Sequence, residues 1–260
     1  MTQSYVEQLF GLSGQVAVVI GATGVLGGAL AEGLARAGAL VVVAGRDAER
    51  GAARVEAIKA AGGNARFSQV DVMRRESIEA LLADILKVEG RVDMLVNGAG
   101  VNSASAYLDA SDDDWDRVFQ SNLKAVHWGC QIFGKAMVEA GGGSILNIGS
   151  VSAHLPLSRV FAYSAAKAAV INLTQNVARE FATLNVRVNA LCPGFFPAEQ
   201  NRKILDPSRV DSIMRQTPMD RFGNPEELIG ATILLLSKAA GSFITGAAYY
   251  VDGGFTGMRL

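Results

Sequence analysis

The chain has 260 residues, of which 50% are hydrophobic and 19% charged, with 24 basic and 25 acidic side chains. This composition excludes an intrinsically disordered chain and a polyelectrolyte, so we expect neither a nucleic acid nor a membrane as its partner. The length is sufficient for one domain with a sizeable core, which we predict to cover residues 1–260.

The cysteine and histidine content limits the chemistry further. Cys130 and Cys192 cannot form a disulfide framework, and with only His127 and His154 we expect no metal site. A cytoplasmic location fits two cysteines. Residues 8–31 carry no charge, but no basic residue precedes them and six glycines interrupt them, so we expect neither a signal peptide nor a membrane span.

Apolar runs of strand length alternate with longer amphipathic segments along the chain. Strands are predicted at residues 15–20, 40–44, 65–70, 92–96, 144–148, 186–191 and 247–251. Helices are predicted at residues 26–37, 48–61, 76–89, 113–140, 162–184 and 225–236. Because the strand runs are too uniformly apolar for a sheet with one wet face, they indicate a parallel sheet covered on both sides. The order predicts an α/β fold, a single doubly wound Rossmann sheet of about seven strands with helices on both faces.

The stretch at about 193–221 is the long irregular region of the sequence. It mixes Pro, Asn, Arg and Phe without a clean period. Because ligands of open parallel sheets bind beyond the carboxyl ends of the strands, an insertion after the sixth strand predicts a substrate lid.

A glycine-rich turn follows the first predicted strand and opens a helical pattern. Glycines at this place permit a tight turn and let the backbone approach a pyrophosphate, which the positive end of the next helix stabilises. An ordinary glycine-rich loop is the alternative. We predict a dinucleotide site with contacts from Gly21, Thr23, Gly24, Val25, Leu26 and Gly27.

The end of the second predicted strand indicates which dinucleotide is bound. An acidic residue there would bind the ribose 2′-hydroxyl of NAD, but this chain has Gly45 and Arg46. A guanidinium is suited to the 2′-phosphate of NADP, although Arg46 could instead stack on the adenine or be solvated. We predict NADP in preference to NAD.

Further cofactor contacts are predicted where the third and fourth strands end. Asp71 and Val72 would flank the adenine, with a helix cap as the alternative role of Asp71. Asn97, Ala99 and Gly100 belong to a turn of small residues, as a backbone lying against a cofactor requires.

Three residues of the sequence predict acid/base chemistry on a carbonyl and alcohol pair. Tyr163 and Lys167 stand four apart in a predicted helix and therefore share one side of it. The ammonium is expected to lower the pKa of the phenol toward the range of proton exchange. Ser150, thirteen residues before Tyr163, could hydrogen-bond the same substrate oxygen. The alternatives are a surface Tyr–Lys pair and a capping serine.

Taken in order, these motifs resemble the short-chain dehydrogenase/reductase superfamily over essentially the whole chain. The matching positions are the turn at 21–27, the sequence NGAG at 97–100, Asn122, Ser150, Tyr163, Lys167, Pro193 with Gly194, and residues 251–254. The resemblance implies that Tyr163 is the general acid/base, that Lys167 tunes it and holds the nicotinamide ribose, and that Ser150 orients the carbonyl. Asn122 is implied to support a water-linked proton relay, or else to satisfy local backbone. Further implied cofactor contacts are Tyr163, Lys167, Pro193, Gly194 and Phe196.

The chain departs from the pattern of the superfamily at two places. Ile20 replaces its Thr, and Gly24 stands one position before its middle glycine, where this chain has Val25. We therefore expect the turn to follow a shifted course. Ala198 stands where the superfamily often supplies a Thr to the nicotinamide amide, so that anchor is in question.

Within the superfamily, residues 193–202 and 156–159 are most similar to the sugar-acid subgroup of D-mannonate oxidoreductases, also called fructuronate reductases. The resemblance implies hydride transfer to the ketone of a keto-uronate or related sugar acid. Arg159 and Arg202 could bind its carboxylate, or be solvated or interface charges. Candidate contacts to its hydroxyls are Asn102, Ser152, His154 and Asn201, with a packed or capping role as the alternative for His154.

Two other functions share part of this pattern. A 3-oxoacyl thioester (acyl carrier protein) reductase would use the same catalytic residues but should carry a basic docking patch, which the sequence does not show. A non-catalytic cofactor-sensing protein would tolerate loss of Tyr163 or Lys167, and both are present. Small residues in the Tyr163 helix and the habit of the superfamily predict a homo-oligomer, specifically a homotetramer.

Overall fold

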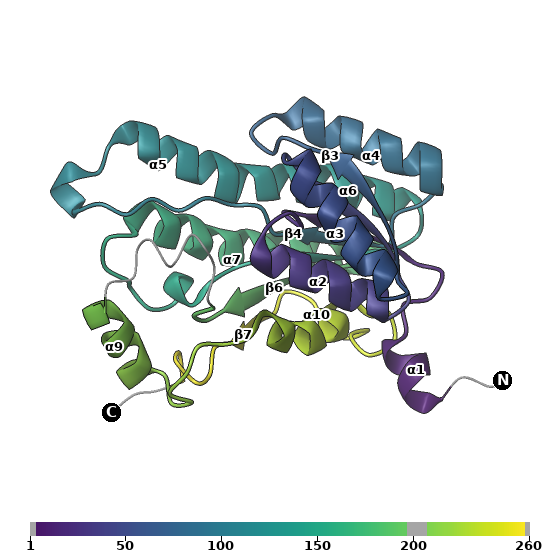
Figure 1. Cartoon of the computed structure of the whole chain (residues 1–260). Coiled ribbons are helices and arrows are strands. Elements are labelled where there is room, and N and C mark those ends of the chain that lie inside the picture. The colour runs from purple at the N-terminus through teal and green to yellow at the C-terminus, as the bar shows by residue number, and fades with distance from the viewer. Residues whose placement is uncertain (1–3, 197–206, 258–260) are drawn as a thin grey trace.

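Seven apolar segments form the strands of one parallel sheet. Their bounds are β1 (Val16–Ile20), β2 (Leu40–Gly45), β3 (Asn64–Gln69), β4 (Met94–Asn97), β5 (Gly143–Ile148), β6 (Val186–Pro193) and β7 (Ala248–Val251). The strand order is β3-β2-β1-β4-β5-β6-β7, and every neighbouring pair is parallel. The computed structural model describes residues 4–196 and 207–257 (Figure 1). The predicted α/β class and the doubly wound sheet are confirmed.

Helices cover the sheet on both faces (Figure 1). Their bounds are α1 (Tyr5–Phe10), α2 (Val25–Arg36), α3 (Ala48–Ala60), α4 (Arg75–Glu89), η1 (Tyr107–Asp109), α5 (Asp112–Phe119), η2 (Gln120–Lys124), α6 (Ala125–Glu139), η3 (Val151–Ala153), α7 (Phe161–Phe181), η4 (Ala182–Leu184), α9 (Pro207–Gln216), η5 (Pro225–Leu228) and α10 (Ile229–Leu236). One core cluster packs α4, α6 and α7 against the sheet, with Phe133 fully buried in it. The other packs α2, α3 and α10 on the opposite face, around Leu30 and Leu34. Strands with both faces covered must be apolar on both sides, which is why their sequences do not alternate.

The connections of the sheet create one crevice. The chain runs outward from β1 through β2 to β3, returns to β4 on the other side of β1, and continues outward to β7. Ile20 and Asn97 are paired residues at the carboxyl ends of β1 and β4, and the loops that follow them leave in opposite directions. Ligands of doubly wound folds bind at such a reversal of strand order.

The segment predicted as one helix at 113–140 is interrupted by a π-helical turn. It consists of α5, the turn η2 and α6 in direct succession. Asn122 lies in η2, and its side-chain Nδ2 donates to the Val118 carbonyl at 3.0 Å and to the Val101 carbonyl at 2.7 Å. A side chain that takes over a backbone acceptor is a known cause of such a local departure from α-helix.

Two α-helices among the described residues were not predicted. The first is α1, which is stabilised at its start by a capping box between Ser4 and Glu7 and buries no residue. The second is α9, which lies inside the stretch expected to be irregular and stands at the opposite end of the molecule from α1 (Figure 1).

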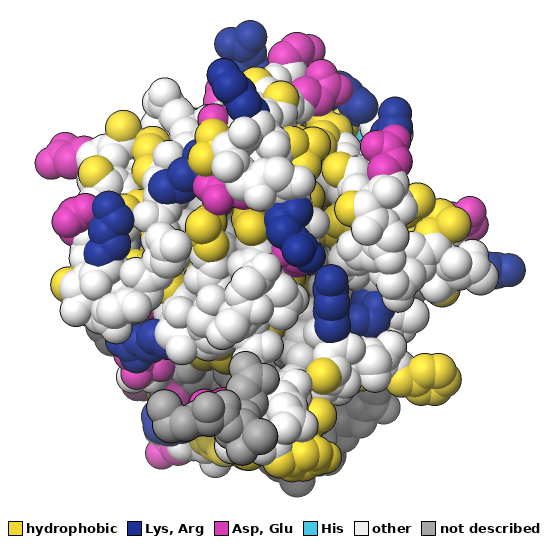
Figure 2. Space-filling model, turned by 90° about the vertical axis from the view of Figure 1, so that its right-hand side faces the viewer, with side chains coloured by type: hydrophobic (Ala, Val, Ile, Leu, Met, Phe, Trp, Pro, Cys, Tyr) yellow, Lys and Arg dark blue, Asp and Glu magenta, His cyan; other side chains and the backbone are white. Residues whose placement is uncertain are grey.

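The surface carries both charges in close mixture. Basic and acidic side chains are interspersed with apolar ones over the face shown in Figure 2. Within residues 4–196 and 207–257, no helix combines the length and apolarity needed to cross a bilayer.

Candidate active site

A cleft of about 980 Å³ opens beyond the carboxyl ends of the strands, at the crevice between β1 and β4. The structure brings most of the predicted site residues together in its walls. Those that line the cleft are Gly21, Thr23, Gly24, Val25, Leu26, Gly27, Arg46, Val72, Ala99, Gly100, Asn102, Asn122, Ser150, Tyr163, Lys167, Pro193 and Gly194. Segments from eight parts of the chain therefore form one site.

The glycine-rich turn is packed too closely for side chains at two of its positions. A Cβ on Gly21, which has a φ of +94°, would lie 2.7 Å from the backbone nitrogen of Ala99. A Cβ on Gly27 would lie 2.4 Å from the carbonyl oxygen of Gly21. Only glycine allows the two backbones to approach in this way. The turn thus forms a cradle of bare backbone at the start of α2.

Gly24 and Val25, where the sequence departs from the pattern of the superfamily, stand at the start of α2. Gly24 is the N-cap of α2 and makes no side-chain capping bond, while Val25 is the first helical residue. Because Val25 has an ordinary helical conformation, it needs no glycine. The first backbone N–H groups of α2 have no capping side chain, an arrangement that suits a bound pyrophosphate. The residues present therefore fit a dinucleotide.

The residues at the end of β2 suit a cofactor with a 2′-phosphate better than one without it. A Cβ on Gly45 would lie 2.7 Å from the side chain of Thr23, so an aspartate at this position would collide with it. Arg46 and Arg50 both line this part of the cleft. Arg50 was not predicted; it belongs to the first turn of α3, one helical turn after Arg46, and approaches Asp47 at 3.8 Å.

Three predicted cofactor residues do not line the cleft. Asp71 accepts a hydrogen bond from the N–H of Met73 at 3.1 Å, which is the capping role considered as its alternative. The side chain of Asn97 is buried and donates to Oδ1 of Asn147 at 2.9 Å. Phe196 is 4% exposed and packs in the core cluster that includes Leu228.

Ser150, Tyr163 and Lys167 meet in the cleft as predicted. Tyr163 lies in the first turn of α7, and its hydroxyl is hydrogen-bonded to Ser150, which follows β5 by two residues. Lys167 lies one turn further along α7, and its Nζ is 5.5 Å from the centroid of the Tyr163 ring. The same Nζ donates to the carbonyl oxygen of Ile148 at 2.7 Å. A hydroxyl, a phenol and an ammonium are thus held by β5 and α7.

Burial controls the ionisation of these groups. Burial raises the pKa of the Tyr163 phenol above its ordinary value, whereas the hydrogen bond with Ser150 lowers it. Burial lowers the pKa of Lys167 to about 8. The predicted lowering of the Tyr163 pKa is wrong for this arrangement, because loss of solvation of the phenolate outweighs the stabilising contacts. Tyr163 is therefore protonated at neutral pH and is equipped to donate a proton.

Asn122 is fully buried beside the catalytic cleft. Its Nδ2 donates to the nearby Val118 carbonyl, which is the alternative role considered for it, and also to Oγ of Ser121 at 3.1 Å and to the more distant Val101 carbonyl. Within the described part of the chain, its Oδ1 has no hydrogen-bond partner, and a Cβ on Gly100 would lie 2.2 Å from that atom. Asn122 thus ties the loop after β4 to η2, and its part in a proton relay stays a prediction.

The residues predicted to bind substrate are only partly brought together. Asn102 lines the cleft, whereas Ser152 is buried behind it and donates through Oγ to Oγ of Ser150 at 3.0 Å. His154 does not line the cleft; its ring is exposed and lies 6.0 Å from that of Tyr250, centroid to centroid.

The predicted carboxylate clamp is not formed by Arg159. This residue is exposed, has a φ of 69° and lies outside the lining of the cleft, because the loop turns away there and its carbonyl accepts from the N–H of Ser105. Asn201 and Arg202 lie outside the described residues.

Arg209 is a residue of the cleft that the sequence interpretation missed. It lies in α9 and lines the end of the cleft where Leu157, Val160 and Phe195 also lie. Its Nη2 donates to the carbonyl oxygen of Ser158 at 2.8 Å, in the loop that leads into Tyr163. Nothing in the local sequence distinguishes Arg209 from a solvated arginine, since α9 has few apolar residues to reveal its period.

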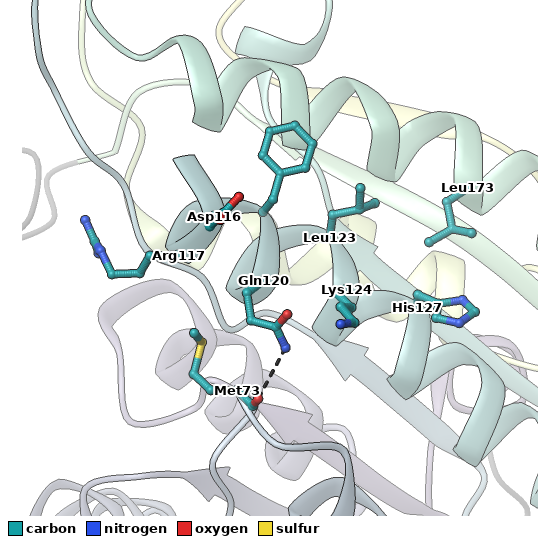
Figure 3. A pocket seen from close by; sticks show the side chains of 9 residues that line it. Met73, Asp116, Arg117, Gln120, Leu123, Lys124, His127 and Leu173 are labelled. Carbon is teal, nitrogen blue, oxygen red and sulfur yellow. Dashed lines mark hydrogen bonds between the residues drawn. The ribbon is translucent and has the colours of Figure 1, made fainter. Parts of the chain in front are cut away.

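A second hollow of about 830 Å³ lies along α5, η2 and α6 (Figure 3). Leu123, His127 and Leu173 contribute to its wall, and the Gln120 amide donates to the carbonyl of Met73 at 3.2 Å across one end of it. It contains no phenol or hydroxyl paired with a cation. Among residues 4–196 and 207–257, no three His, Cys, Asp or Glu side chains gather as metal ligands.

Known proteins resemble this chain along its whole length. The family model described as Enoyl-(Acyl carrier protein) reductase matches residues 21–256. The "Uncharacterized oxidoreductase UxuB" of Bacillus subtilis (strain 168) is 40% identical over 265 residues, which cover 94% of this chain and 95% of that protein. The gluconate 5-dehydrogenase of Gluconobacter oxydans (strain 621H) is 36% identical over 95% of this chain and 97% of its own.

A solved structure shows the same similarity in three dimensions. The crystal structure of a gluconate 5-dehydrogenase from Burkholderia cenocepacia J2315, in complex with NADP and tartrate, superposes with a TM-score of 0.94. It is 33% identical to this chain, and the match covers 98% of this chain and 100% of that one.

Proposed function

The chain belongs to the short-chain dehydrogenase/reductase superfamily and is an NAD(P)-dependent oxidoreductase, and we propose that it interconverts a ketone and a secondary alcohol on a sugar acid. The observation that carries the proposal is the meeting of Ser150, Tyr163 and Lys167 at the end of a dinucleotide cradle. These three groups are what proton transfer to a carbonyl oxygen requires.

The proposed reaction divides the work between the cofactor and the protein. A nicotinamide dinucleotide held by the cradle at Gly21 and Gly27 would supply or accept the hydride at the substrate carbon. Tyr163 donates its phenolic proton to the carbonyl oxygen as that oxygen becomes an alkoxide, and Ser150 donates a hydrogen bond to the same oxygen. Lys167 stabilises the phenolate that remains. In the oxidative direction the phenolate takes the proton back.

NADP is the proposed cofactor, in preference to NAD. No acidic side chain stands at position 45 to repel a 2′-phosphate, and Arg46 and Arg50 supply positive charge at the same end of the cleft, where Asp47 also lies. The gluconate 5-dehydrogenase from Burkholderia cenocepacia, which was solved with NADP, supports this choice.

The proposed substrate is a keto-uronate or a related keto acid of a sugar. The relatives named gluconate 5-dehydrogenase support a sugar acid, and the D-mannonate-like motifs of the sequence favour a keto-uronate. Arg209 replaces Arg159 as the proposed partner of the carboxylate, because it lines the cleft from α9. The segment at 193–221, which includes α9, is the proposed lid.

A panel of substrates tests the proposal. Keto-uronates, keto-gluconates, neutral ketoses and 3-oxoacyl thioesters are each assayed with NADPH and with NADH. We expect the highest kcat/KM for a keto acid with NADPH. The acyl-carrier-protein wording of the family model favours a second candidate, and preferential turnover of thioesters would replace our proposal with it. Dinucleotide binding without turnover of any ketone would indicate a non-catalytic sensing protein.

We also propose that the chain assembles into a homotetramer in the cytoplasm. The hollow along α5, η2 and α6 is a surface on which a second copy could pack, with Leu123 and Leu173 in its wall (Figure 3). Cys130 and Cys192 are free, buried thiols, which agrees with a reducing compartment. Sedimentation equilibrium measures the mass directly, and a monomer at all concentrations would contradict the assembly.

A further inference from the structure

Three buried polar residues form a hydrogen-bonded ladder directly beneath the active site. Asn97 of β4 donates from Nδ2 to Oδ1 of Asn147 in β5 at 2.9 Å. Asn147 donates from its own Nδ2 to Oγ1 of Thr174 in α7, also at 2.9 Å. The three side chains are 4%, 0% and 1% exposed. The ladder therefore connects two strands to one helix inside the core.

The ladder is anchored at both ends. At one end, Thr174 donates from Oγ1 to the Val170 carbonyl of α7 at 2.7 Å. At the other end, the amide of Asn97 packs directly against the backbone of α6 at Gly129. A Cβ on Gly129 would lie 2.2 Å from Oδ1 of Asn97, so no larger residue fits there. Asn97 and Asn147 are also paired residues of the parallel sheet, so their side chains share one face. Such a buried network is costly to break, because an amide left without a partner has no water to replace its hydrogen bond.

Each residue of the ladder lies close in the chain to a residue of the proposed cofactor or catalytic site. Asn97 directly precedes the turn 98–100, which lines the cofactor cradle. Asn147 precedes Ile148, whose carbonyl binds Lys167, and stands three residues before Ser150. Thr174 follows Lys167 by seven residues, which is about two turns of α7 and places it on a similar face.

We infer that Asn97, Asn147 and Thr174 are positioning residues that set the catalytic helix α7 in register with the cofactor turn. This inference rests on the proposed function. The hydride and the proton reach the substrate from different elements, and their separation is fixed by how α7 sits on β4 and β5. A displacement of the order of 1 Å between reacting groups lowers the rate by as much as about 100-fold.

Thr174→Val tests the inference, because valine has nearly the volume of threonine but accepts no hydrogen bond. Thr232→Val is the matched control. Thr232 is also 1% exposed and donates from Oγ1 to a carbonyl one turn earlier, that of Leu228 at 2.8 Å, but it lies in α10 on the other face of the sheet. Thr174→Ser restores the hydroxyl and serves as the rescue.

We expect Thr174→Val to lower kcat by about 5- to 50-fold while the dinucleotide Kd changes less than about threefold. With NADPH deuterated at the transferred position, the isotope effect on kcat should increase, because hydride transfer becomes more strongly rate-limiting. Thr232→Val should keep kcat and the isotope effect within about twofold of wild type, and Thr174→Ser should restore both. A smaller active fraction would lower kcat without changing the isotope effect.

Two results would overturn the inference. One is an equal change of kcat in Thr174→Val and Thr232→Val, and the other is a lower kcat with an unaltered isotope effect. If the wild type reduces no ketone, the proposed function fails instead, and hydrogen exchange still tests the ladder. Thr174→Val should then speed amide exchange at residues 98–102 at least threefold, whereas Thr232→Val should not, and equal exchange in both variants counts against the ladder.

Discussion

Lys167 donates a hydrogen bond from Nζ to the carbonyl oxygen of Ile148 at 2.7 Å, in the last residue of β5. The same ammonium lies 5.5 Å from the centre of the Tyr163 ring. The end of β5, which Ser150 follows by two residues, therefore also holds the ammonium that stabilises the Tyr163 phenolate in the proposed reaction. The Tyr163 phenol and the Lys167 ammonium are thus positioned by one strand end and one helix.

This arrangement predicts a pH dependence of ketone reduction. The Tyr163 pKa is raised, so its proton is present through neutral pH, whereas the Lys167 pKa of about 8 lies within the range of an assay. Reduction needs both protons, so kcat should be constant below about pH 7 and fall as Lys167 loses its charge above pH 8. Lys167→Arg keeps the charge and should remove the decline near pH 8. A constant rate up to pH 10 in wild type would contradict this role of Lys167.

Tyr163→Phe removes only the phenolic oxygen. Loss of a general acid costs about 100- to 10,000-fold in rate, so kcat should fall by this factor while the dinucleotide still binds. Stopped-flow turnover and fluorescence titration with NADPH measure the two quantities separately. Tyr249→Phe, at an exposed tyrosine of β7, is the control and should behave as wild type. Comparable turnover by Tyr163→Phe would exclude Tyr163 as the acid.

Arg46 should control the choice of dinucleotide. Charge-assisted hydrogen bonds contribute about 1.5–3 kcal/mol, so Arg46→Ala should weaken NADPH binding by roughly 10- to 100-fold. NADH lacks the 2′-phosphate, and its Kd should hardly change. Arg36→Ala is an exposed control at the end of α2. An equal loss for both dinucleotides would mean that Arg46 contacts the adenine instead.

The sequence was sufficient to predict the sheet and much of the site, for physical reasons. Strands buried on both faces are continuously apolar, and β1 and β2 are clear for this reason. Tyr163 and Lys167 were found because a four-residue spacing on a helix brings side chains together without any tertiary information. The Gly21 turn was found because it follows a strand and opens a helix.

Other features depend on contacts that a sequence does not contain. The amide of Asn122, in the π-helical turn, binds the Val101 carbonyl, twenty-one residues away along the chain. The helix α9 is amphipathic, with Ile213 as its buried apolar anchor, but it is short and lies within the stretch that was predicted to be irregular. Arg209 is distinguished from the exposed Arg159 only by where α9 packs.

Asp93 should be a major determinant of stability. It is 3% exposed, accepts from the N–H of Val16 at 2.9 Å and pairs with Arg91 at 2.6 Å, so these contacts hold its pKa below the ordinary value although burial alone would raise it. Asp93→Asn should lower the unfolding free energy at pH 7 by about 1–3 kcal/mol.

The sign of the pH effect follows from the lowered pKa of Asp93. Its stabilisation is complete above the pKa of the unfolded chain and is lost as pH falls through the lower pKa of the folded chain. Urea unfolding between pH 7 and pH 3 should therefore show the difference between wild type and Asp93→Asn shrinking toward acid. Glu139→Gln removes an exposed ion pair with Lys135 and should change stability by less than about 1 kcal/mol. A difference that is independent of pH would show that the charge of Asp93 is not responsible.

Arg209 should discriminate acidic from neutral substrates. It lines the cleft from α9 and is held by the Ser158 carbonyl at 2.8 Å, so its charge is positioned near the loop that leads to Tyr163. A guanidinium that binds a carboxylate contributes about 1.5–3 kcal/mol, so Arg209→Gln should raise KM for a keto-uronate by roughly 10- to 100-fold. For a neutral ketose, KM should stay within about twofold. Arg209→Lys should lie between the two, because it keeps the charge but not the fork.

The matched control for Arg209 is on the same helix. Arg215 is exposed in the last turn of α9, and Arg215→Gln removes an equal charge from the same helix at a residue that does not line the cleft. If α9 merely acts through its overall charge, both variants should change KM alike, and the change should disappear in high salt. If Arg209 binds the carboxylate, only Arg209→Gln should raise KM, and only for acidic substrates. Loss of affinity for acid and neutral substrates together would assign Arg209 to the packing of α9 instead of to recognition.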